Sequence, residues 1–410
     1  MIRKNCLFCN SNKLSTIIDL GLHPFADTFL KKKDLSEGES VYPLVCDLCE
    51  DCGNVQLQCI TKPEGRYVEH DYSYTSSNSN FSKNHWINYA KEVSQKVDLK
   101  SGLVVEIGSN DGFLSEQFLN RGNKVLGVDP SPYVAKLARE RGVTTHVELF
   151  GSKSVSKILQ VGKAELVIAN NVLNHSDNPV DFVNAVAQIL DDEGTFVYEL
   201  PYWLSSVESG KFDQIYHEHV SYLNVRSSKK LLKQAGLKIV DIQVVDYHGG
   251  SLRIYAKHVS QAVQAPDEIE KLEKKEVEFG LFDLDTYSVF MKNLKAARAS
   301  FLKQIYQLKK ENKTIIAVGA AAKGNTLLNF YGIDNKIVDY VTDASKHKQN
   351  KYTPYTRIPI CSDDVFKEYS SPYALILSWN LSTTLKESLT RLNQKIQFIN
   401  PWEKNKNNEN

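Results

Sequence analysis

The chain has 410 residues, of which 42% are hydrophobic and 24% are charged, and its formal net charge is +1. A chain of this length is expected to form two or three domains, and the composition is that of a soluble globular protein. The small net charge does not favour nucleic acid or an anionic membrane as a partner. No apolar run approaches the roughly 18 residues that span a bilayer, and the first residues lack the apolar segment of a signal peptide. We therefore expect a cytoplasmic protein with no nucleic-acid or membrane partner, as a monomer or a homodimer.

Six of the seven cysteines lie before residue 60, between short apolar runs that predict a small β-rich module. They include two Cys-x-x-Cys pairs, Cys6 with Cys9 and Cys49 with Cys52. Two such pairs supply the four thiolates of a tetrahedral zinc shell, and reduced thiols favour a metal site over disulfides. Cys46 also forms a Cys-x-x-Cys pair with Cys49 and could replace Cys52, but the glycine after Cys52 suits the tight turn of a zinc knuckle. The sequence predicts one closed, structural Zn²⁺ site.

Residues 66–85 are rich in Tyr, Ser and Asn and predict a long loop or linker, after which a helical pattern begins near Trp86. From residue 103 the pattern alternates between buried strand, turn and helix, which is the signature of a doubly wound parallel sheet. The predicted elements are strands 103–108, 124–130, 165–170 and 194–201, and helices 113–122, 131–142 (with Ser131 as N-cap) and 179–190.

Residues 267–312 are charged and predict helical structure, and the α/β alternation then restarts. One apolar face of this helical region comprises Phe290, Leu294, Ala297, Phe301, Ile305 and Leu308. The later predicted elements are strands 314–320, 336–343, 373–379 and 396–401, and helices 324–332 and 382–392. The fold class is therefore α/β, with boundaries at 1–65 for the cysteine module, 66–265 for a central α/β domain, 266–312 for a helical connector, 313–403 for a second α/β domain and 404–410 for a disordered tail.

A glycine-containing turn follows the first strand of the central domain and opens a helix. It contains Glu106, Gly108, Asn110 and Gly112. The glycines let the backbone approach a ligand closely at the carboxyl edge of the sheet. The spacing is not the dinucleotide pattern G-x-G-x-x-G, so it favours a nucleoside without a pyrophosphate. S-adenosylmethionine (SAM) is such a ligand, and another cofactor of a nucleotide-binding fold is the alternative.

Two further strands place polar residues at the same edge of the predicted sheet. Asp129 ends the second strand, where a carboxylate can accept hydrogen bonds from both ribose hydroxyls. Asn170 and Asn171 follow the third strand and would border the same cofactor. These positions together predict a SAM site along the carboxyl edge.

The stretch Tyr216-His217-Glu218-His219 concentrates two imidazoles, a phenol and a carboxylate, and three interpretations compete. A metal site lacks the helical spacing of H-E-x-x-H and a marked third ligand. A polar loop whose side chains satisfy one another is the plainest alternative. The third is an acid–base site, in which an imidazole takes a proton from an acidified carbon, Glu218 orients it and Tyr216 donates to a developing oxyanion.

Together these motifs resemble the nucleotide-sugar C-methyltransferases, which add a methyl branch to a 4-keto-6-deoxyhexose. The resemblance covers nearly the whole chain, through the N-terminal cysteines and the motifs IIDLGLHPFADTFL, CGNVQL, YSYTSSNS, VVEIGSNDGFL, NNVLNHSDN, FDQIYHEHVSYL, HGGSLRIY, GAAAKGNTLLN and TPYTRIPI. It implies an N-terminal zinc module, a central Rossmann-like SAM domain and a second, C-terminal Rossmann-like domain. The implied substrate is a nucleotide-linked 4-keto-6-deoxy sugar.

The resemblance also implies roles for individual residues. His219 is the implied base that removes the C3 proton acidified by the C4 ketone, with Tyr216 and Glu218 beside it. The resulting enolate attacks the methyl group of SAM from C3. His175, in NNVLNHSDN, is implied as a further site member near the reacting carbon.

Four other residues are implied to contact the cofactor or the sugar. Tyr74 and His85 match the segment that closes over both ligands in the family. Lys323 and Asn325 lie in a Gly-rich turn between a predicted strand and helix. Such a turn, with the helix N-terminus and the lysine charge, can bind the sugar's diphosphate, whereas the alternative is an ordinary turn with a solvated lysine.

The loop after Asp343 departs from the family pattern, which bears on the nucleotide base that is recognised. Lys346 stands where proline is usual, and Asn350 and Tyr355 stand where glycine is usual. Asn accepts a positive φ more readily than tyrosine, so we expect Asn350 to keep its turn and Tyr355 not to adopt one easily. Two other functions fit the sequence: an O- or N-methyltransferase on a nucleotide sugar, and a non-catalytic nucleotide-sugar-binding zinc protein.

Overall fold

The computed structural model describes residues 1–62, 66 and 75–402. The chain divides into two compact units, each built from segments that are not contiguous in sequence. The sequence patterns predicted contiguous domains instead, and those boundaries stay a prediction. Tyr74 and the expected disordered tail lie outside the described residues. The first unit comprises residues 1–16, 46–206 and 219–284, and the second comprises 17–45, 207–218 and 285–410.

The first unit contains a seven-stranded sheet in the order β10-β11-β8-β7-β4-β5-β6. Neighbouring strands are parallel except in the two pairs that involve β11. Central strand β4 is buried at all its positions, as expected for a parallel sheet covered on both faces. The strands are β4 (Leu103–Ile107), β5 (Lys124–Val128), β6 (Thr144–His146), β7 (Ala164–Ile168), β8 (Leu190–Pro201), β10 (Leu237–Val245) and β11 (Ser251–His258).

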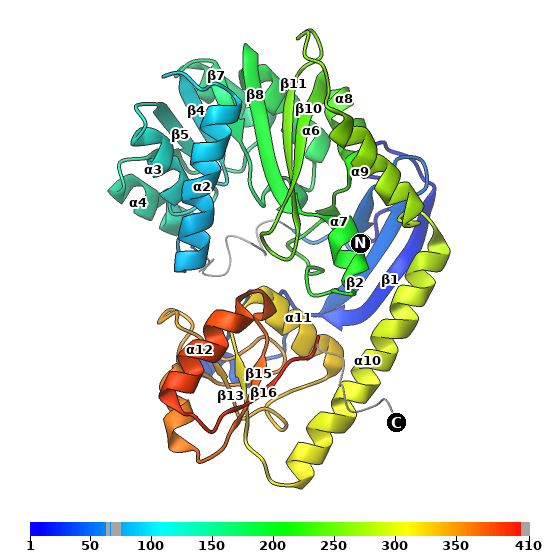
Figure 1. Cartoon of the computed structure of the whole chain (residues 1–410), viewed down its shortest axis with the longest axis vertical. Helices are drawn as coiled ribbons and strands as arrows, with labels where there is room; N and C mark the ends of the chain where they lie inside the picture. Colours follow the sequence, from blue (N-terminus) through cyan, green and yellow to red (C-terminus); the bar gives the residue numbers. More distant parts are fainter. Residues whose placement is uncertain (63–65, 67–74, 403–410) are drawn as a thin grey trace. The chain divides into compact units, whose positions relative to one another are not determined.

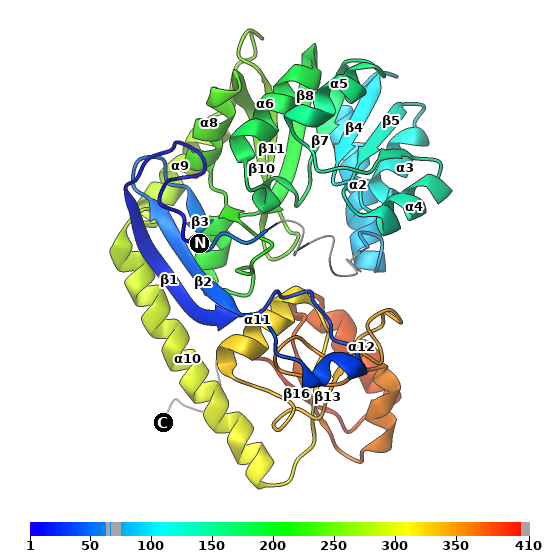
Figure 2. The same ribbon diagram turned by 180° about the vertical axis from the view of Figure 1, so that it is seen from behind.

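Helices cover both faces of this sheet. Helix α2 lies over the face seen in Figure 1, and α6 and α8 lie over the face seen in Figure 2. Trp86 and Tyr89 of α2 pack with Phe118 of α3 against Val104 of β4 and Ile168 of β7. The helices are α2 (Asn80–Lys96), α3 (Phe113–Leu119), α4 (Pro132–Glu140), α5 (Ser152–Leu159), the 3-10 turn η2 (Leu173–His175), α6 (Pro179–Ile189), α7 (Trp203–Glu208), α8 (Val225–Gln234) and α9 (Asp267–Glu278).

The predicted cysteine module contributes strands to a second sheet, in the order β1-β2-β3-β9. The dividing points between the two units fall within β1 and β2, and β3 and β9 belong to the first unit. Its strands are β1 (Leu14–His23), β2 (Tyr42–Cys49), β3 (Val55–Leu57) and β9 (Ser221–Tyr222).

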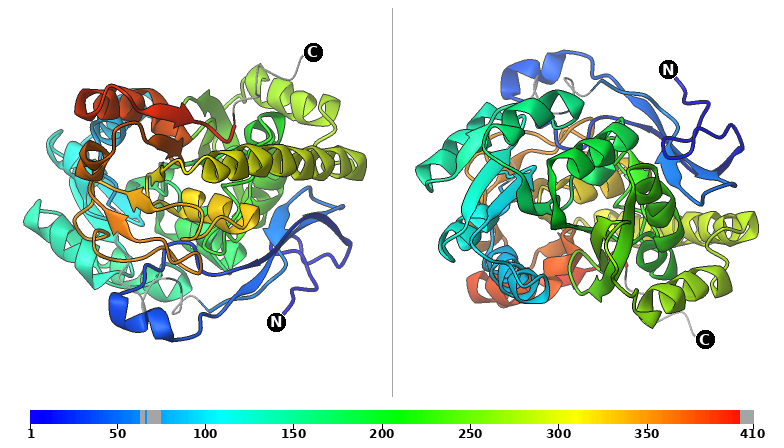
Figure 3. Two further views of the ribbon diagram at one scale, coloured as in Figure 1. Left: turned by 90° about the horizontal axis from the view of Figure 1, so that it is seen from below. Right: turned by 90° about the horizontal axis from the view of Figure 1, so that it is seen from above.

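The second unit contains a five-stranded parallel sheet in the order β14-β13-β12-β15-β16. Its core includes Ile316, Ala374 and Phe366, and helix α12 contributes Leu389. Its elements are η1 (Lys32–Ser36), α10 (Leu284–Lys310), β12 (Ile315–Val318), α11 (Ala322–Tyr331), β13 (Tyr340–Thr342), β14 (Ile360–Cys361), η3 (Asp363–Glu368), β15 (Tyr373–Ile376), η4 (Trp379–Leu381), α12 (Ser382–Leu392) and β16 (Gln397–Ile399). Figure 3 shows α10 as one continuous helix.

The segment between β1 and β2 belongs to the second unit because side chains and backbone of that unit hold it. Arg357 donates to the carbonyl oxygens of Leu35 (2.7 Å) and Glu37 (2.8 Å). Leu30 exchanges backbone hydrogen bonds with Tyr352. These contacts join positions more than 300 residues apart, which local sequence patterns do not reveal.

The predicted elements exist, with three local differences. Helix α2 begins at Asn80 rather than near Trp86, because the side chain of Ser79 caps it by accepting from the Ser82 amide. Ser131 occupies the N-cap position of α4, but its side chain makes no capping hydrogen bond. Ala297 is exposed, whereas the other members of the predicted apolar face of α10 are buried.

Tyr355 differs from the expectation that it would not adopt a left-handed conformation. Its φ is 63°, and that of Asn350 is 64°. The Tyr355 amide donates to the Glu39 carboxylate at 2.7 Å, and Thr353 and Ile358 exchange hydrogen bonds around the turn. The surrounding contacts therefore hold a tyrosine in a conformation that it would not choose locally.

Candidate active site and metal centre

Four cysteine side chains converge in the first unit. The Sγ atoms of Cys6, Cys9, Cys49 and Cys52 all lie within 4.8 Å of one another. The Cys6–Cys52 and Cys9–Cys49 Sγ distances are 3.5 and 3.6 Å. A tetrahedral shell with Zn–S bonds of about 2.3 Å needs S–S distances of roughly 3.8 Å, so the thiols are close to that geometry. The residues fit a four-cysteine zinc site.

The two Cys-x-x-Cys pairs form matching turns. The amide of Asn10 donates to the Cys6 carbonyl at 2.9 Å, and that of Gly53 donates to the Cys49 carbonyl at 2.8 Å. Asn10 and Gly53 each follow the second cysteine of their pair, and their φ angles are 60° and 72°. A left-handed residue at this point turns the chain back so that both thiolates of a pair face one ion.

Cys46 lies outside this group. Cys46 is on β2 and is fully buried. The sequence allowed either Cys46 or Cys52 as the fourth ligand, and the cluster contains Cys52. Successive side chains of a strand alternate between its faces, so Cys46 and Cys49, three residues apart on β2, point to opposite faces. The structure thus selects Cys52 as the fourth thiol.

The turn after β4 has the backbone geometry that a closely approaching ligand needs. Gly108 and Gly112 have φ angles of 68° and 75°, and Asn110 has φ 49°. A Cβ on Gly108 would lie 2.2 Å from the side chain of Val172, and one on Gly112 would lie 2.8 Å from the backbone of Ala138. Only glycine therefore fits at these two positions.

Two buried carboxylates flank this turn. Asp129 accepts from the backbone amides of Asn110 (3.0 Å) and Ser131 (2.9 Å), and burial raises its pKa to about 6 despite these two bonds. Glu106 accepts from the hydroxyl of Ser115, and burial raises its pKa to about 8. Asp129 thus braces the turn, and each of its oxygens keeps a second lone pair for a ligand hydroxyl.

Three side chains that the sequence did not single out tie the segment before α2 to this turn. The Ser76 amide donates to Asn110 Oδ1 at 2.8 Å, and the Ser76 hydroxyl donates to Asp111 at 2.6 Å. The Ser77 hydroxyl also donates to the Asp111 carboxylate. The sequence could have indicated these residues, because Asp111 lies inside the glycine-containing turn and both serines lie in the motif YSYTSSNS.

The carboxyl edge also presents polar groups that have no partner in the described part of the chain. The side-chain amide oxygen and nitrogen of Asn170 are buried and unpaired, as is the hydroxyl of Ser109. Asn171 has φ 54°, and its amide donates to the Glu199 carbonyl at 2.8 Å. Unpaired buried polar groups are costly, so this edge fits a polar ligand such as SAM.

His175 and His219 form a close imidazole pair in the first unit. Their ring centroids are 5.0 Å apart, with 53° between the ring planes. The Val220 amide donates to the Asn174 carbonyl at 2.7 Å, which joins the two segments that carry the rings. Burial and, secondarily, the charge of Arg66 lower the pKa of His175 to about 3, so His175 is neutral at physiological pH.

The remaining members of the Tyr-His-Glu-His stretch belong to the second unit, because the division falls between Glu218 and His219. Glu218 is buried and Tyr216 is half-buried. The ring of His217 makes edge contacts at 5.8 Å with Phe25 and with Tyr42. The surroundings of His217 favour a packing role.

His85 is held in place from two sides. Its Nε2 lies 2.7 Å from Oε1 of Glu199, and its ring stacks on that of Tyr247 with centroids 3.7 Å apart. Arg253 donates to the other oxygen of Glu199 at 2.8 Å. The sequence did not single out Glu199 or Arg253, although Glu199 is the one charged residue in the buried part of strand β8, residues 194–200.

Lys323 lies in the second unit, in the first turn of α11. Its Nζ is buried and has no hydrogen-bond partner among the described residues. Burial, assisted by Lys211, lowers its pKa to about 8, while Asp213 opposes this change. The centroid of the Trp379 ring lies 3.4 Å from Lys211 Nζ and 5.6 Å from Lys323 Nζ, so two lysine side chains contact one indole.

Asn325 is the other predicted ligand contact in this turn, and one of its two polar side-chain atoms already has a hydrogen-bond partner. Its Nδ2 donates to the Ala26 carbonyl at 2.6 Å, whereas its buried Oδ1 has no partner in the described chain. A Cβ on Gly319 would lie 2.1 Å from the Ser378 hydroxyl, so the turn requires glycine there. The turn thus resembles the one after β4 in having a positive-φ glycine before a helix, with φ 97° at Gly319.

Comparison with known proteins accounts for nearly the whole chain. Residues 6–67 match the family described as "Putative zinc binding domain", residues 82–242 match "Methyltransferase domain" and residues 246–402 match "C-methyltransferase C-terminal domain". C-methyltransferase NovU of Streptomyces niveus is 29% identical over 377 residues, which are 92% of this chain and 89% of that protein. Three family models together thus match most of the chain, and the chain is similar to a C-methyltransferase over nearly its full length.

Other similarities are confined to part of the chain. A ubiquinone biosynthesis O-methyltransferase of Xanthomonas oryzae is 30% identical over 105 residues, which are 25% of this chain and 44% of that protein. A solved SAM-dependent methyltransferase from Clostridium acetobutylicum is 17% identical, with a TM-score of 0.35, and covers 44% of this chain and 93% of its own.

The family match bears out the two predicted cofactors. The methyltransferase domain is a SAM domain, and its matched range contains the turn after β4, Asp129 and Asn170. The zinc-binding range contains all four clustered cysteines. Bound SAM supplies an electrophilic methyl group, and the structural zinc holds the two cysteine turns together. In the described chain, no helix has the length and apolar character needed to cross a membrane.

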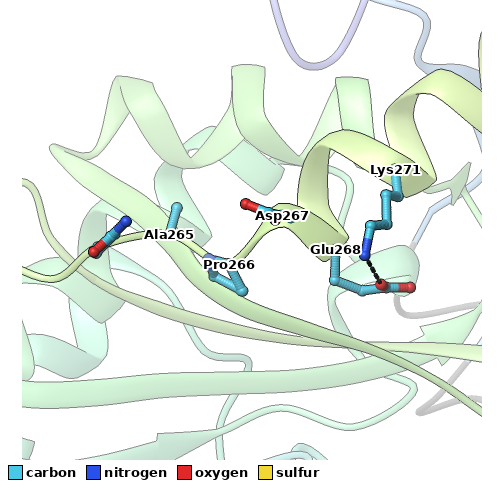
Figure 4. A pocket seen from close by; sticks show the side chains of 6 residues that line it. Ala265, Pro266, Asp267, Glu268 and Lys271 are labelled. Carbon is cyan, nitrogen blue, oxygen red and sulfur yellow. Dashed lines mark ion pairs between the residues drawn. The ribbon is translucent and has the colours of Figure 1, made fainter.

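A separate surface hollow lies beside the N-terminus of α9 (Figure 4). Its volume is about 500 Å³ and it is lined by Gln264, Ala265, Pro266, Asp267, Glu268 and Lys271. The Lys271 ammonium lies 3.8 Å from the Glu268 carboxylate. The hollow contains none of the predicted site residues, and its charged rim is that of an ordinary solvated helix start.

Proposed function

We propose that this protein is a SAM-dependent C-methyltransferase that adds a methyl branch, at C3, to a nucleotide-linked 4-keto-6-deoxy sugar. The observation that carries the proposal is the pair of histidines, His175 and His219, in the unit that has the SAM turn. Methylation of carbon needs a base that can take a proton from that carbon, and an imidazole beside a second, neutral imidazole suits this task.

The proposed reaction breaks the C3–H bond and transfers its proton to His219. The electron pair moves onto the C4 carbonyl, so O4 carries the negative charge of an enolate. C3 then forms a bond to the methyl carbon as the bond from sulfur to that carbon breaks. Tyr216 donates to O4, and Glu218 orients and charge-stabilises the base. His175, with its pKa near 3, is assigned to hold the sugar beside the reacting carbon as a neutral hydrogen-bonding group.

The second unit is proposed to bind the diphosphate of the substrate. Lys323 supplies a cation whose Nζ has no hydrogen-bond partner among the described residues, and it lies in the first turn of α11, where the helix dipole favours anions. Asn325 Oδ1 is an available acceptor for a sugar or nucleoside hydroxyl. His85 is proposed to bind the sugar within the first unit.

The decisive experiment is a product analysis with a panel of dTDP-, GDP-, UDP- and CDP-linked 4-keto-6-deoxy sugars. Each is incubated with the zinc-loaded protein and SAM whose methyl group is labelled with carbon-13. We expect one nucleotide class to give a labelled methyl signal on a quaternary carbon. The same experiment separates the alternatives: a methoxy or N-methyl signal indicates O- or N-methylation, and absence of transfer to the whole panel indicates a binding protein or another acceptor.

A further inference from the structure

Glu199 is a buried carboxylate, and each of its two oxygens contacts a charged or polar side chain from another element. Its side chain is completely buried in the first unit, near the carboxyl end of β8. One oxygen lies 2.7 Å from His85 Nε2, and the other lies 2.8 Å from Arg253 Nε. Burial alone would raise its pKa, but the hydrogen bond and charge of His85 and Arg253 outweigh burial and hold the pKa below its ordinary value.

An ionised carboxylate has no proton to donate, so the His85 nitrogen that faces it must be the donor. The hydrogen bond therefore shows that Nε2 carries a hydrogen. Nδ1 is then the ring nitrogen that can form a hydrogen bond with a ligand. Among the described residues Nδ1 has no hydrogen-bond partner, and the side chain of His85 is 14% exposed. This nitrogen is the part of the ring that is available to a ligand.

The ring is also restrained against rotation. Tyr247 stacks on one face with only 2° between the planes, and Trp86 approaches the ring edge-on at 4.7 Å. The Glu199 main chain accepts from the Asn171 amide at 2.8 Å, which places the pair beside the predicted cofactor loop. A carboxylate behind an imidazole, with the second nitrogen free at a ligand-binding edge, is the arrangement that orients histidines for work on a ligand.

We propose that Glu199 is a positioning residue that fixes His85 with Nε2–H inward, so that Nδ1 hydrogen-bonds a hydroxyl of the methyl acceptor. Arg253 helps to keep Glu199 ionised by donating to its second oxygen, and it does not contact the ligand itself. The assignment of an acceptor hydroxyl rests on the proposed function. The assignment of the His85–Glu199 hydrogen bond does not.

The first test therefore needs no substrate. Proton NMR of the zinc- and SAM-loaded protein should contain a slowly exchanging, downfield imidazole N–H signal. We expect His85→Asn and Glu199→Gln each to remove it. Glu92→Gln is the matched control, because Glu92 binds the opposite side of Arg253 at 2.8 Å and is 57% exposed. Absence of the signal in the wild type, its survival in Glu199→Gln or its loss in Glu92→Gln would overturn the assignment.

The second test is kinetic and uses the acceptor found with the nucleotide-sugar panel. We expect Glu199→Gln and His85→Asn each to lower kcat/KM for the acceptor about 10- to 100-fold, the range found when an orienting partner is lost. The double variant should lose no more than the stronger single variant, because both changes remove one function. SAM affinity should stay within about threefold of the wild type. Multiplicative losses would mean that Glu199 acts independently of His85, as a residue of the core.

Discussion

The imidazole rings of His175 and His219 lie 5.0 Å apart, although 43 intervening residues separate them in sequence. The Asn174–Val220 backbone hydrogen bond holds the two segments together directly beside the rings. Two histidines in such proximity cannot both carry charge without repulsion, and burial already keeps His175 neutral. A neutral His175 leaves room for His219 to accept a proton from carbon, and this relationship underlies the first two predictions.

Replacing His219 with Asn should abolish methyl transfer while leaving SAM binding within about threefold. The amide keeps the size and polarity of the side chain but cannot accept a proton at neutral pH. The proposed substrate exchanges its C3 proton with deuterated water only if a base removes that proton, so exchange should fall with turnover. Wild-type exchange in His219→Asn would show that another group is the base. His217→Asn is the matched control, and it should retain exchange because that ring packs against Phe25 and Tyr42.

His175 should make stability depend on pH in a defined direction. Its pKa is about 3 in the folded protein and 6.5 ordinarily, so between these values the unfolded chain binds a proton that the folded protein does not. The contribution is present above pH 6.5 and is lost as pH falls. His175→Gln should therefore lose less free energy of unfolding than the wild type from pH 7 to pH 5, by up to about 2 kcal/mol. Denaturant titrations of both proteins check this, and parallel pH curves would contradict a neutral His175 in the folded protein.

The zinc assignment predicts opposite results for two neighbouring cysteines. Cys52→Ser should reduce bound zinc from about one equivalent to well below one, because a serine hydroxyl is a poor zinc ligand. Cys46→Ser should retain about one equivalent and lose only packing stability, because Cys46 lies outside the thiol cluster. Elemental analysis of the purified proteins gives the ratio directly. Zinc loss in Cys46→Ser with retention in Cys52→Ser would reverse the assignment.

Lys323 should contribute a pH-dependent share of nucleotide binding. Its pKa is about 8, so its charge, and the attraction to a diphosphate, should weaken as pH rises from 7 to 9. Lys323→Met should lower the affinity for the preferred nucleoside diphosphate about tenfold or more at pH 7, since a hydrogen bond to a charged group contributes about 1.5–3 kcal/mol. The variant should also lose most of this pH dependence. Calorimetric titrations provide the measurement, with exposed Lys336→Met of the same unit as a control that should bind like the wild type.

Tyr355 should be a site where glycine stabilises the protein. Its φ of 63° costs a tyrosine roughly 1 kcal/mol more than a glycine, and its side chain is 56% exposed and so loses little packing. We expect Tyr355→Gly to raise Tm by a few degrees. Arg357→Gly is the contrasting variant: Arg357 also has positive φ (53°), but its side chain donates to Leu35 and Glu37. Its Tm should fall, and a rise in both variants would mean that these contacts contribute nothing.

Local patterns in the sequence determined the elements and the motifs that depend on neighbouring residues. The alternation of buried strand and helix predicted the central α/β domain, and the spacing of Cys6, Cys9, Cys49 and Cys52 predicted a zinc site whose thiols the structure brings together. The turn from Glu106 to Gly112 was identifiable because positive φ angles and close approach require glycine within a few consecutive residues. Such features depend on short-range sterics, which a sequence displays directly.

Only the tertiary structure decided which distant residues act together. Neither strand β8 nor helix α2 indicates by itself that Glu199 lies 2.7 Å from His85, and Asp213 and Trp379 join Lys323 from separate segments. The choice of Cys52 over Cys46, the left-handed Tyr355 and the assignment of residues 17–45 to the second unit have the same origin. Burial, ion pairing and sheet register arise when separated segments pack, and the energies of those contacts override the local preferences that a sequence pattern records.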